Sequence, residues 1–279
     1  MRKFLVLVAV AASFGVLQVG VAHAAACGVV TSSTTLTSDC VAPLIVGASG
    51  ITVDLNNHAV VCNLNVDGIL VPNFVSSVHV RNGRVTSGLS PCFNGLDVKG
   101  SSSVFSALHI RDATHQGVQV DGDSNRLTAI TSDRNVGDGF IVFGSDNTIT
   151  SSSAADNDDD GISFFVGSDN TVLASRAVGN ADKGIISGSS RTLILSNISS
   201  NNGRGIYLSD NSTGSLVLSN STTNNVIGIE INPTSSSNRV VGNISLSNTL
   251  FDLSDDNANC DSNFWAFNVF GTRNQSCIH

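Results

Sequence analysis

The sequence has little positive charge and, beyond its first residues, no long apolar run. It contains 14 Lys and Arg against 22 Asp and Glu in 279 residues, which gives a formal charge of −8 at pH 7. Because nucleic-acid binding requires a basic surface opposite the phosphates, this balance argues against a nucleic-acid partner and favours a neutral or metal-bridged one. A membrane-spanning helix requires about 20 apolar residues, and no segment after residue 24 provides them.

Three further absences narrow the fold and the chemistry. No apolar period of 3.6 residues is sustained, and Gly, Asn, Asp and Ser interrupt the chain densely, so a helical fold is excluded. A serine nucleophile elbow, a phosphate-binding loop and a dinucleotide fingerprint are all missing, which leaves nucleotide chemistry without support. No Cys-x-x-Cys pair occurs, so the cysteines do not favour a zinc site.

The first 24 residues have the pattern of an export signal. Arg2 and Lys3 precede an apolar stretch at 4–21, and small residues at 22–24 offer a cleavage site. Polar residues and glycines interrupt the stretch, which disfavours a membrane anchor, and Cys27 lacks the preceding aliphatic residue of a lipoprotein signal. Cleavage leaves 255 residues, 12 of them basic and 22 acidic, with a charge of −10. We therefore expect an extracytoplasmic protein, periplasmic or secreted, whose mature chain does not span a membrane.

All six cysteines follow the expected cleavage site and lie near the two ends of the chain. Export would place them where disulfides persist, and six cysteines allow 15 connectivities. We favour pairing between sequence neighbours, because the terminal coils of a stacked repeat lack a neighbour and gain most from a covalent link. The expected pairs are Cys27 with Cys40, Cys62 with Cys92, and Cys260 with Cys277.

A glycine followed by an apolar residue recurs through the middle of the chain. The steps between successive glycines are 22, 22, 22, 23, 21 and 23 residues. The pairs are Gly95-Leu96, Gly117-Val118, Gly139-Phe140, Gly161-Ile162, Gly184-Ile185, Gly205-Ile206 and Gly228-Ile229. Two series of asparagines run in phase with these pairs. One contains Asn125, Asn147, Asn170 and Asn238, and the other contains Asn135, Asn157, Asn180, Asn201 and Asn224.

Short β-branched or aliphatic runs bounded by turn-forming residues lie between these markers, as at 118–120 and 148–150. A unit of about 22 residues built from strands and tight turns cannot bury its apolar face alone, so it must stack on its neighbours. The sequence therefore predicts an all-β fold, a single-stranded parallel β-helix of about eleven coils. The residue after each glycine should point inward, and the asparagines should occupy turns and hydrogen-bond from coil to coil.

Residues 25–279 should form one domain. We expect an N-terminal cap and the first coils at 25–94, regular repeats at 95–253 and a C-terminal cap at 254–279. The last segment contains the only tryptophan, Trp265, and should cover the open end of the core.

Several motifs resemble a known family. The stretch Gly-Ile-Thr-Val-Asp-Leu-Asn-Asn-His at 50–58, the recurring Asn-x-x-x-Gly-Ile turns and the aromatic tail at 263–270 between Cys260 and Cys277 are similar to right-handed parallel β-helix proteins of the bacterial carbohydrate-binding and sugar-hydrolase type, also called NosD-like. This resemblance implies a right-handed, pectate-lyase-like solenoid. It implies less about activity, because that superfamily contains pectate lyases, alginate lyases, mannuronan epimerases, tailspikes and proteins without known activity. The Asp-Pro-His-Asp motif of mannuronan epimerases and the Gly-Gly-x-Gly-x-Asp calcium repeat are missing here.

Aligning the coils by their glycines produces two columns of residues on one ridge. The position before each glycine holds Gln116, Asp138, Asp160, Lys183, Arg204 and Ile227, and the position before that holds His115, Gly137, Asp159, Asp182, Gly203 and Val226. Successive members of a column would lie about 4.8 Å apart, the spacing of neighbouring strands. The columns therefore place carboxylates beside two cations and a histidine.

This ridge suits the binding and chemistry of uronic acid polymers. Its carboxylates offer the hard oxygen ligands that Ca²⁺ prefers, and Ca²⁺ is the one cofactor we expect. Its cations could act as a base or a clamp, and a neighbouring tyrosine could donate a proton or stack against a sugar. The candidate metal ligands are Asp138, Asp158, Asp159 and Asp160. The candidate catalytic residues are Lys183, Arg204 and Tyr207, and the candidate substrate-binding residues are His115, Gln116 and Asp182.

The predicted function is an exported protein that binds, and could cleave or epimerise, an acidic polysaccharide. The strongest alternative is a noncatalytic surface or matrix protein whose stiff solenoid is its function, since exposed turns are rich in Asp, Asn and Lys for solubility alone. An enzyme should hold Asp138, Asp160, Lys183 and Arg204 in one groove, whereas a spacer would leave them splayed. Ice binding ranks last, because the threonines keep no constant column.

Overall fold

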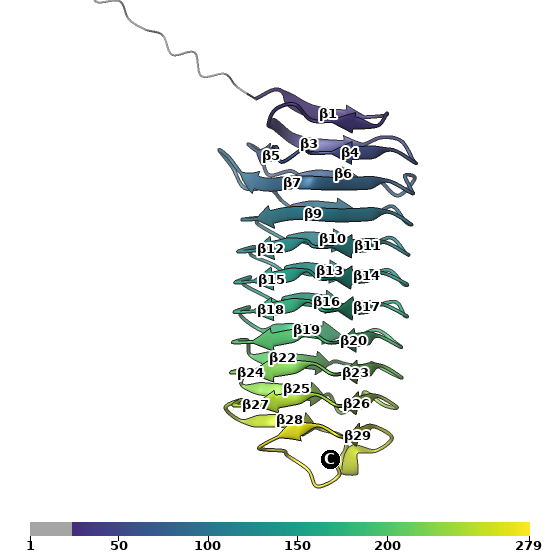
Figure 1. Cartoon of the computed structure of the whole chain (residues 1–279), viewed down its shortest axis with the longest axis vertical. Coiled ribbons are helices and arrows are strands. Elements are labelled where there is room, and N and C mark those ends of the chain that lie inside the picture. The colour runs from purple at the N-terminus through teal and green to yellow at the C-terminus, as the bar shows by residue number, and fades with distance from the viewer. Residues whose placement is uncertain (1–23) are drawn as a thin grey trace, which may run out of the picture.

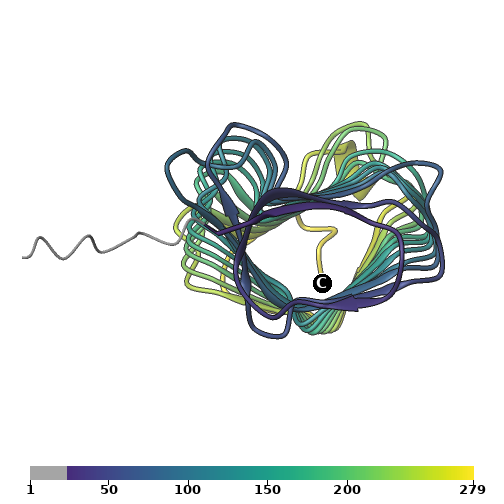
Figure 2. The ribbon, with the colours of Figure 1, turned by 90° about the horizontal axis from the view of Figure 1, so that it is seen from above.

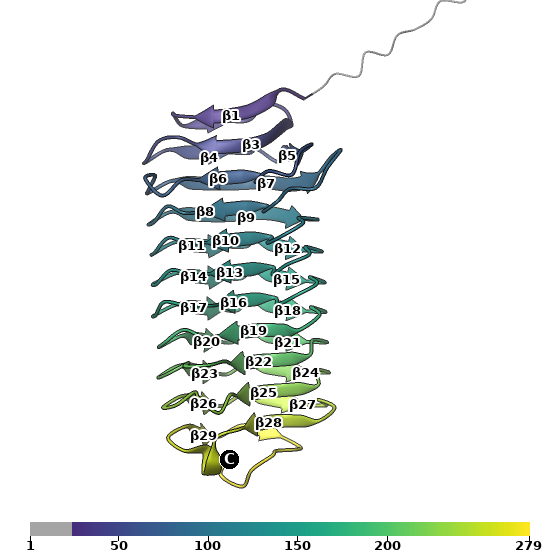
Figure 3. The same cartoon turned by 180° about the vertical axis from the view of Figure 1, so that it is seen from behind.

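The computed structural model describes residues 24–279, and the expected export signal lies outside the described residues. Residues 24–279 form a parallel β-solenoid of about ten turns with a period of about 23 residues (Figures 1 and 3). The predicted fold class is confirmed. The first coils are longer than the regular repeat: the paired residues Leu44, Ile69 and Leu96 are 25 and 27 residues apart.

Pairing between coils produces three parallel ladders of strands, which we call sheets 1, 2 and 3. Sheet 1 contains β1 (Ala26–Val30), β3 (Cys40–Val46), β6 (Ile69–Val71), β8 (Leu96–Val98), β10 (Val118–Val120), β13 (Phe140–Val142), β16 (Ile162–Phe164), β19 (Lys183–Ser187), β22 (Arg204–Leu208), β25 (Ile227–Ile231) and β28 (Phe251–Asp255). Sheet 2 contains β2 (Thr34–Thr35), β4 (Thr52–Asp54), β7 (His79–Ser87), β9 (Val104–Arg111), β11 (Arg126–Thr128), β14 (Thr148–Thr150), β17 (Thr171–Leu173), β20 (Leu193–Leu195), β23 (Leu216–Leu218), β26 (Arg239–Val241) and β29 (Phe264–Ala266).

Sheet 3 shares three strands with the other two, because β3, β7 and β9 are long enough to continue around a corner of the coil. Its remaining strands are β5 (Ala59–Cys62), β12 (Thr131–Asp133), β15 (Ser153–Ala155), β18 (Arg176–Val178), β21 (Ile198–Ser200), β24 (Ser221–Thr223), β27 (Ile244–Leu246) and β30 (Val269–Phe270). The one helical element of the described residues is a single 3₁₀ turn, η1 (Ala258–Cys260). Within residues 24–279, no helix has the length and apolar character needed to cross a membrane.

The residue after each repeat glycine points into the solenoid, as predicted. All seven are fully buried, and each pairs with its counterpart in the next coil. They are Leu96, Val118, Phe140, Ile162, Ile185, Ile206 and Ile229. Burying one such side chain contributes about 1.5–3 kcal/mol. The stack is therefore the apolar centre of the fold.

The repeat glycines are required by close contact between coils. A Cβ atom on Gly161 would lie 2.5 Å from the carbonyl oxygen of Gly184 and 2.7 Å from the side-chain nitrogen of Asn180. Both contacts are far shorter than van der Waals separation. Only a glycine at this corner leaves enough room for the backbone of the next coil and an asparagine side chain to pack against it.

Buried asparagines form ladders that join the turns. Asn135 donates its backbone N–H to the side-chain oxygen of Asn157 at 3.0 Å, and Asn157 does the same to Asn180 at 3.2 Å. This ladder continues through Asn202 and Asn225. The prediction of Asn201 and Asn224 was therefore wrong by one residue. Those two residues have positive φ, 58° and 57°, and turn the chain toward the asparagine that follows each of them.

The three disulfides join the predicted pairs, Cys27–Cys40, Cys62–Cys92 and Cys260–Cys277. Disulfides of this kind are typical of proteins outside the cytosol. At the other end from β1, Trp265 is buried in β29 and donates its ring N–H to Asp255 at 2.8 Å. The tail thus adds two more strands, β29 and β30, before the last residues turn across the open end, where Figure 2 places the C-terminus inside the ring of coils.

We predict that Asn157→Ala lowers the free energy of unfolding by about 2–4 kcal/mol, because it leaves buried donors of Asn135 without an acceptor. The midpoint of urea denaturation measures this change. Asn73→Ala, in an exposed turn, serves as the control and should leave the midpoint unchanged. Equal midpoints for the two variants would show that the ladder does not hold the coils together.

Candidate functional site

Sheet 1 has a second column of side chains that points away from the core. It is the position two residues after each repeat glycine, and we call it the floor column. Its members from β8 to β25 are Asp97, Gln119, Ile141, Ser163, Ile186, Tyr207 and Glu230. Although these side chains face outward, Ser163 is only 3% exposed and Glu230 only 5%. The floor column is therefore recessed between the turns that border sheet 1 on its two sides.

A pocket of about 440 Å³ lies over the floor column at strands β16, β19 and β22. Its floor contains Ser163, Ile186 and Tyr207. Lys183 stands at one side, on the predicted ridge, and Phe165 and Asp210 belong to the turns on the other side. The remaining lining residues are Phe164, Gly188 and Ser209. We call this space the central pocket. It combines an ammonium group, a phenol, a carboxylate and an aromatic ring within one concave surface.

The predicted column before the glycines forms a ladder of its own. Asp138 accepts the backbone N–H of Asp160 at 3.0 Å, and Asp160 accepts the backbone N–H of Lys183 at 2.9 Å. Gln116 accepts the N–H of Asp138 in the same way. The expected register is thus confirmed. The carboxylates are not exposed on a ridge, however, because Asp138 is 4% and Asp160 8% exposed.

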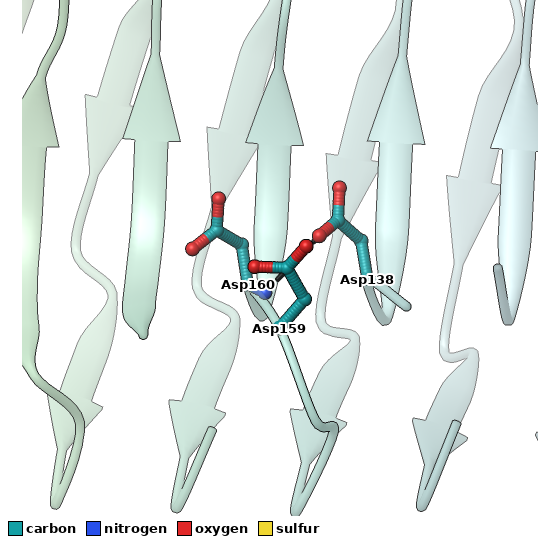
Figure 4. A group of neighbouring side chains, drawn as sticks. All are labelled: Asp138, Asp159 and Asp160. Atoms are coloured by element: carbon teal, nitrogen blue, oxygen red, sulfur yellow. Dashed lines mark hydrogen bonds between the residues drawn. The ribbon is translucent and has the colours of Figure 1, made fainter. Parts of the chain in front are cut away.

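Three carboxylates come together on these coils. Asp138, Asp159 and Asp160 each present an oxygen, and the three oxygens lie within 4.8 Å of one another (Figure 4). The predicted ligand Asp158 is exposed and does not belong to this group. Burial, together with the charge of Asp160, raises the pKa of Asp138 to about 8. Burial raises the pKa of Asp160 to about 6, although the charge of Lys183 opposes this shift. Of the two carboxyl groups, Asp138 therefore holds its proton to the higher pH.

The surroundings of Lys183 favour its protonated form. Its ammonium group contacts Asp182 and lies 3.5 Å from the carboxylate of Asp160. Burial alone would lower the pKa of Lys183, but the hydrogen bond to Asp182 and the charge of Asp160 outweigh it and raise the pKa. Of the two roles predicted for this side chain, its surroundings favour electrostatic binding of an anion.

Arg204 and Tyr207 lie on β22, one coil beyond Lys183. The guanidinium of Arg204 sits 5.1 Å from the centre of the Tyr207 ring and pairs with Glu230. The Tyr207 hydroxyl accepts a hydrogen bond from Asn232 at 2.7 Å. This acceptor role leaves the phenolic proton free to donate into the central pocket. Lys183 and Arg204 are paired positions of β19 and β22. Lys183 and Tyr207 line the central pocket, and Arg204 does not.

Two predicted substrate-binding residues lie several coils away. His115 stacks on Phe93, and Gln116 is occupied by the backbone of Asp138. Neither residue lines the central pocket. Asp182, the third, is half exposed and pairs with Lys183 at the pocket edge.

Comparison with known proteins identifies the family and the fold of this chain. Residues 94–245, more than half of the chain, match the family model described as "Right handed beta helix region". The chain belongs to this right-handed β-helix family. A search of curated proteins finds no match. Solved structures share the fold of this right-handed β-helix at low sequence identity.

Three of these structures illustrate the kinds of protein that share the fold. The mannuronan C-5 epimerase AlgE6 A-module of Azotobacter vinelandii has a TM-score of 0.66 at 12% identity, with 86% of this chain and 74% of that chain covered. The enzymatically active domain of bacteriophage CBA120 tailspike protein 2 has a TM-score of 0.64 at 13% identity, with 76% and 38% covered. The pectate lyase Pel9A has a TM-score of 0.51 at 17% identity, with 84% and 70% covered. The chain thus spans under two fifths of the tailspike domain. Identities this low establish the shared fold.

Sequence reasoning missed seven of the nine residues that line the central pocket, and it also missed Glu230 of the floor column. Ser163 and Glu230 belong to the floor column, and Phe165 and Asp210 border the central pocket. The floor column was within reach, because it is the position two residues after each repeat glycine and alternation in a strand sets it outward. The far border was not, because its turns differ in length and the asparagines that recur in them mark neither Phe165 nor Asp210.

We predict that Asp138→Asn stabilises the protein at pH 9 but not at pH 5. The raised pKa of Asp138 means that wild-type stability is greatest below the unfolded pKa and falls as pH rises toward 8. Asparagine keeps the oxygen that accepts the Asp160 N–H and does not titrate. Thermal melting at both pH values measures the effect, with the exposed neighbour Asp158→Asn as control. Parallel curves for the wild type and Asp138→Asn would contradict it.

Proposed function

We propose that the central pocket binds a uronate residue of an acidic polysaccharide. The observation that carries this proposal is the position of the Lys183 ammonium group at the pocket wall, between the buried carboxylates of the preceding coils and the Tyr207 ring of the next. A sugar carboxylate could pair with Lys183, and the sugar ring could pack against Tyr207 and Phe165. A recessed, strand-lined surface is also a site where a linear polymer can be held in extended form.

A second cation is needed for such a ligand, because the acids around the pocket outnumber the bases. Lys183 and Arg204 already pair with Asp160, Asp182 and Glu230. We propose that Ca²⁺ supplies the missing charge at Asp138, Asp159 and Asp160, whose oxygens are the ligand type it prefers. The chemistry of this donor set fits Ca²⁺, provided that Asp138 gives up its proton. The bound ion would attract the uronate carboxylate toward Lys183.

The names of two neighbours point to the same class of ligand. One acts on mannuronan and another on pectate, both of them polymers of uronic acids. These activities belong to those proteins and support the proposal only by analogy. The three disulfides and the expected export signal are in keeping with a protein that meets such polymers outside the cytoplasm.

Cleavage or epimerisation is a second candidate, favoured by the groups that share the central pocket. Both reactions remove the proton on C5 of a uronate, which requires a base and neutralisation of the sugar carboxylate. Asp210 is the lining carboxylate that could accept this proton, and Lys183 would neutralise the uronate. In β-elimination, the electron pair of the C5–H bond forms the C4–C5 double bond while the C4–O bond breaks. Tyr207 would then protonate the leaving oxygen.

We predict that Ca²⁺ raises the melting temperature more at pH 8.5 than at pH 6, because the metal must displace the proton of Asp138. At a concentration about 100 times the Kd, the expected stabilisation is about 2.7 kcal/mol, or roughly 5–10 °C. Thermal melting with Ca²⁺ or with EDTA tests this. Asp159→Asn should abolish the response, and Asp158→Asn should keep it. No response to Ca²⁺ at either pH would remove the metal from the proposal.

We predict that Lys183→Met weakens binding of oligogalacturonates or oligomannuronates by about tenfold to a hundredfold, the effect of losing a charge-assisted hydrogen bond. Arg176→Met removes a positive charge from sheet 3, away from the pocket, and should leave the affinity unchanged. Calorimetry measures both variants, and the ultraviolet absorbance of unsaturated products reports cleavage. Equal affinities for the two variants would overturn the assignment of the pocket. A wild-type protein without affinity for either polymer would overturn the function.

A further inference from the structure

We infer that Phe93 and His115 form a second sugar-binding surface, which holds another residue of the polysaccharide chain bound in the central pocket. This inference rests on the proposed function. It concerns a different part of the molecule, the border of the floor column at β8 and β10, where neither the fold nor the central pocket requires an exposed ring.

The two rings stack face to face, so His115 covers part of one face of Phe93. Their centres lie 4.8 Å apart and their planes differ by 6°. Phe93 is 41% exposed, so it does not serve the core. A pyranose presents an apolar face of C–H groups, which packs well on an aromatic plane. The face of Phe93 that His115 leaves uncovered is therefore suited to a sugar ring.

Several contacts fix this surface before any ligand arrives. Cys92 is bonded to Cys62, which ties the turn before Phe93 to the preceding coil. The backbone N–H of Phe93 donates to Val66 at 2.9 Å, and the N–H of His115 donates to Phe93 at 2.9 Å. The His115 ring bonds through Nδ1 to Asn94 at 3.0 Å. A surface that is already ordered loses little side-chain entropy when it binds.

The same coils supply polar partners at the floor. Asp97 is 2% exposed, and its Oδ1 finds no hydrogen-bond partner among residues 24–279. An unpaired buried oxygen is costly. Its other oxygen lies 3.2 Å from the ammonium group of Lys99, whose side chain is about half exposed. A sugar hydroxyl that donates to Oδ1 of Asp97 would satisfy this oxygen. Gln119, on the next strand, offers a further amide.

The floor column connects this surface with the central pocket. Asp97 and Tyr207 are five strand steps apart in one continuous ladder. At the usual strand spacing this is about 24 Å. A linear polymer that follows the column would contact both places, and the second contact would then be intramolecular. Long oligosaccharides should therefore bind more tightly than short ones, and the difference should depend on Phe93.

The test compares uronate disaccharides with octasaccharides in the presence of Ca²⁺, using calorimetry on the full chain. Phe93→Ala should weaken octasaccharide binding roughly tenfold and leave disaccharide binding unchanged. Lys183→Met should weaken both. Phe93→Trp, which keeps the aromatic plane, should retain the octasaccharide affinity, whereas Phe93→Leu should not. Phe267→Ala, which removes an 84% exposed ring from the last coil, is the matched control.

The outcomes separate the two proposals. If Phe93→Ala binds octasaccharides as the wild type does while Lys183→Met binds weakly, the second surface is overturned and the central pocket stands. If Phe93→Ala weakens disaccharide and octasaccharide binding equally, Phe93 acts on the fold and not as a separate surface, which also overturns the inference. If the wild type binds neither oligomer, both proposals are overturned.

Discussion

The hydrogen bonds that join the same position of successive coils hold this molecule together. In the strands they are backbone pairs, and in the turns a buried side-chain oxygen takes the place of a carbonyl, as Asn157 and Asn180 show. Each coil therefore copies the path of the one before it. Because these side-chain oxygens accept buried backbone N–H groups, loss of the side chains would leave those groups without acceptors. The repeat glycines, the inward aliphatic stack and the floor column are all positions that recur because successive coils follow the same path.

The features that the sequence predicts well are those that every coil repeats. The Gly-aliphatic pairs define the register, so the inward stack from Leu96 to Ile229 could be named residue by residue. The buried asparagine of an adjacent pair was harder to predict. Both Asn201 and Asn202 suit a turn, and only the backbone dihedral angles decide which one is buried. The border formed by Phe165 and Asp210 could not be predicted, since its turns vary in length from coil to coil.

The candidate site also shows how structural and chemical roles can coincide in one side chain. The column of Asp138, Asp160 and Lys183 was expected to be an exposed ridge, yet its carboxylates hold the backbone of the next coil. That task buries them, and burial raises their pKa values. Periodicity revealed where these residues lie along the axis. It could not reveal their burial, which depends on the neighbouring turns and on Asp159 and Asp182.

The positions of the disulfides have a consequence for how such a stack comes apart. An inner coil contacts two neighbours and a terminal coil only one, so stacked repeats fray most easily from their ends. Cys27–Cys40 and Cys62–Cys92 lie in the first coils, and Cys260–Cys277 closes the last. Both easy routes are thus blocked by covalent bonds, and opening must begin in the middle, where two interfaces break at once. The terminal coils should therefore resist proteolysis while their disulfides are intact. Under reducing conditions the chain should be digested from its terminal coils inward.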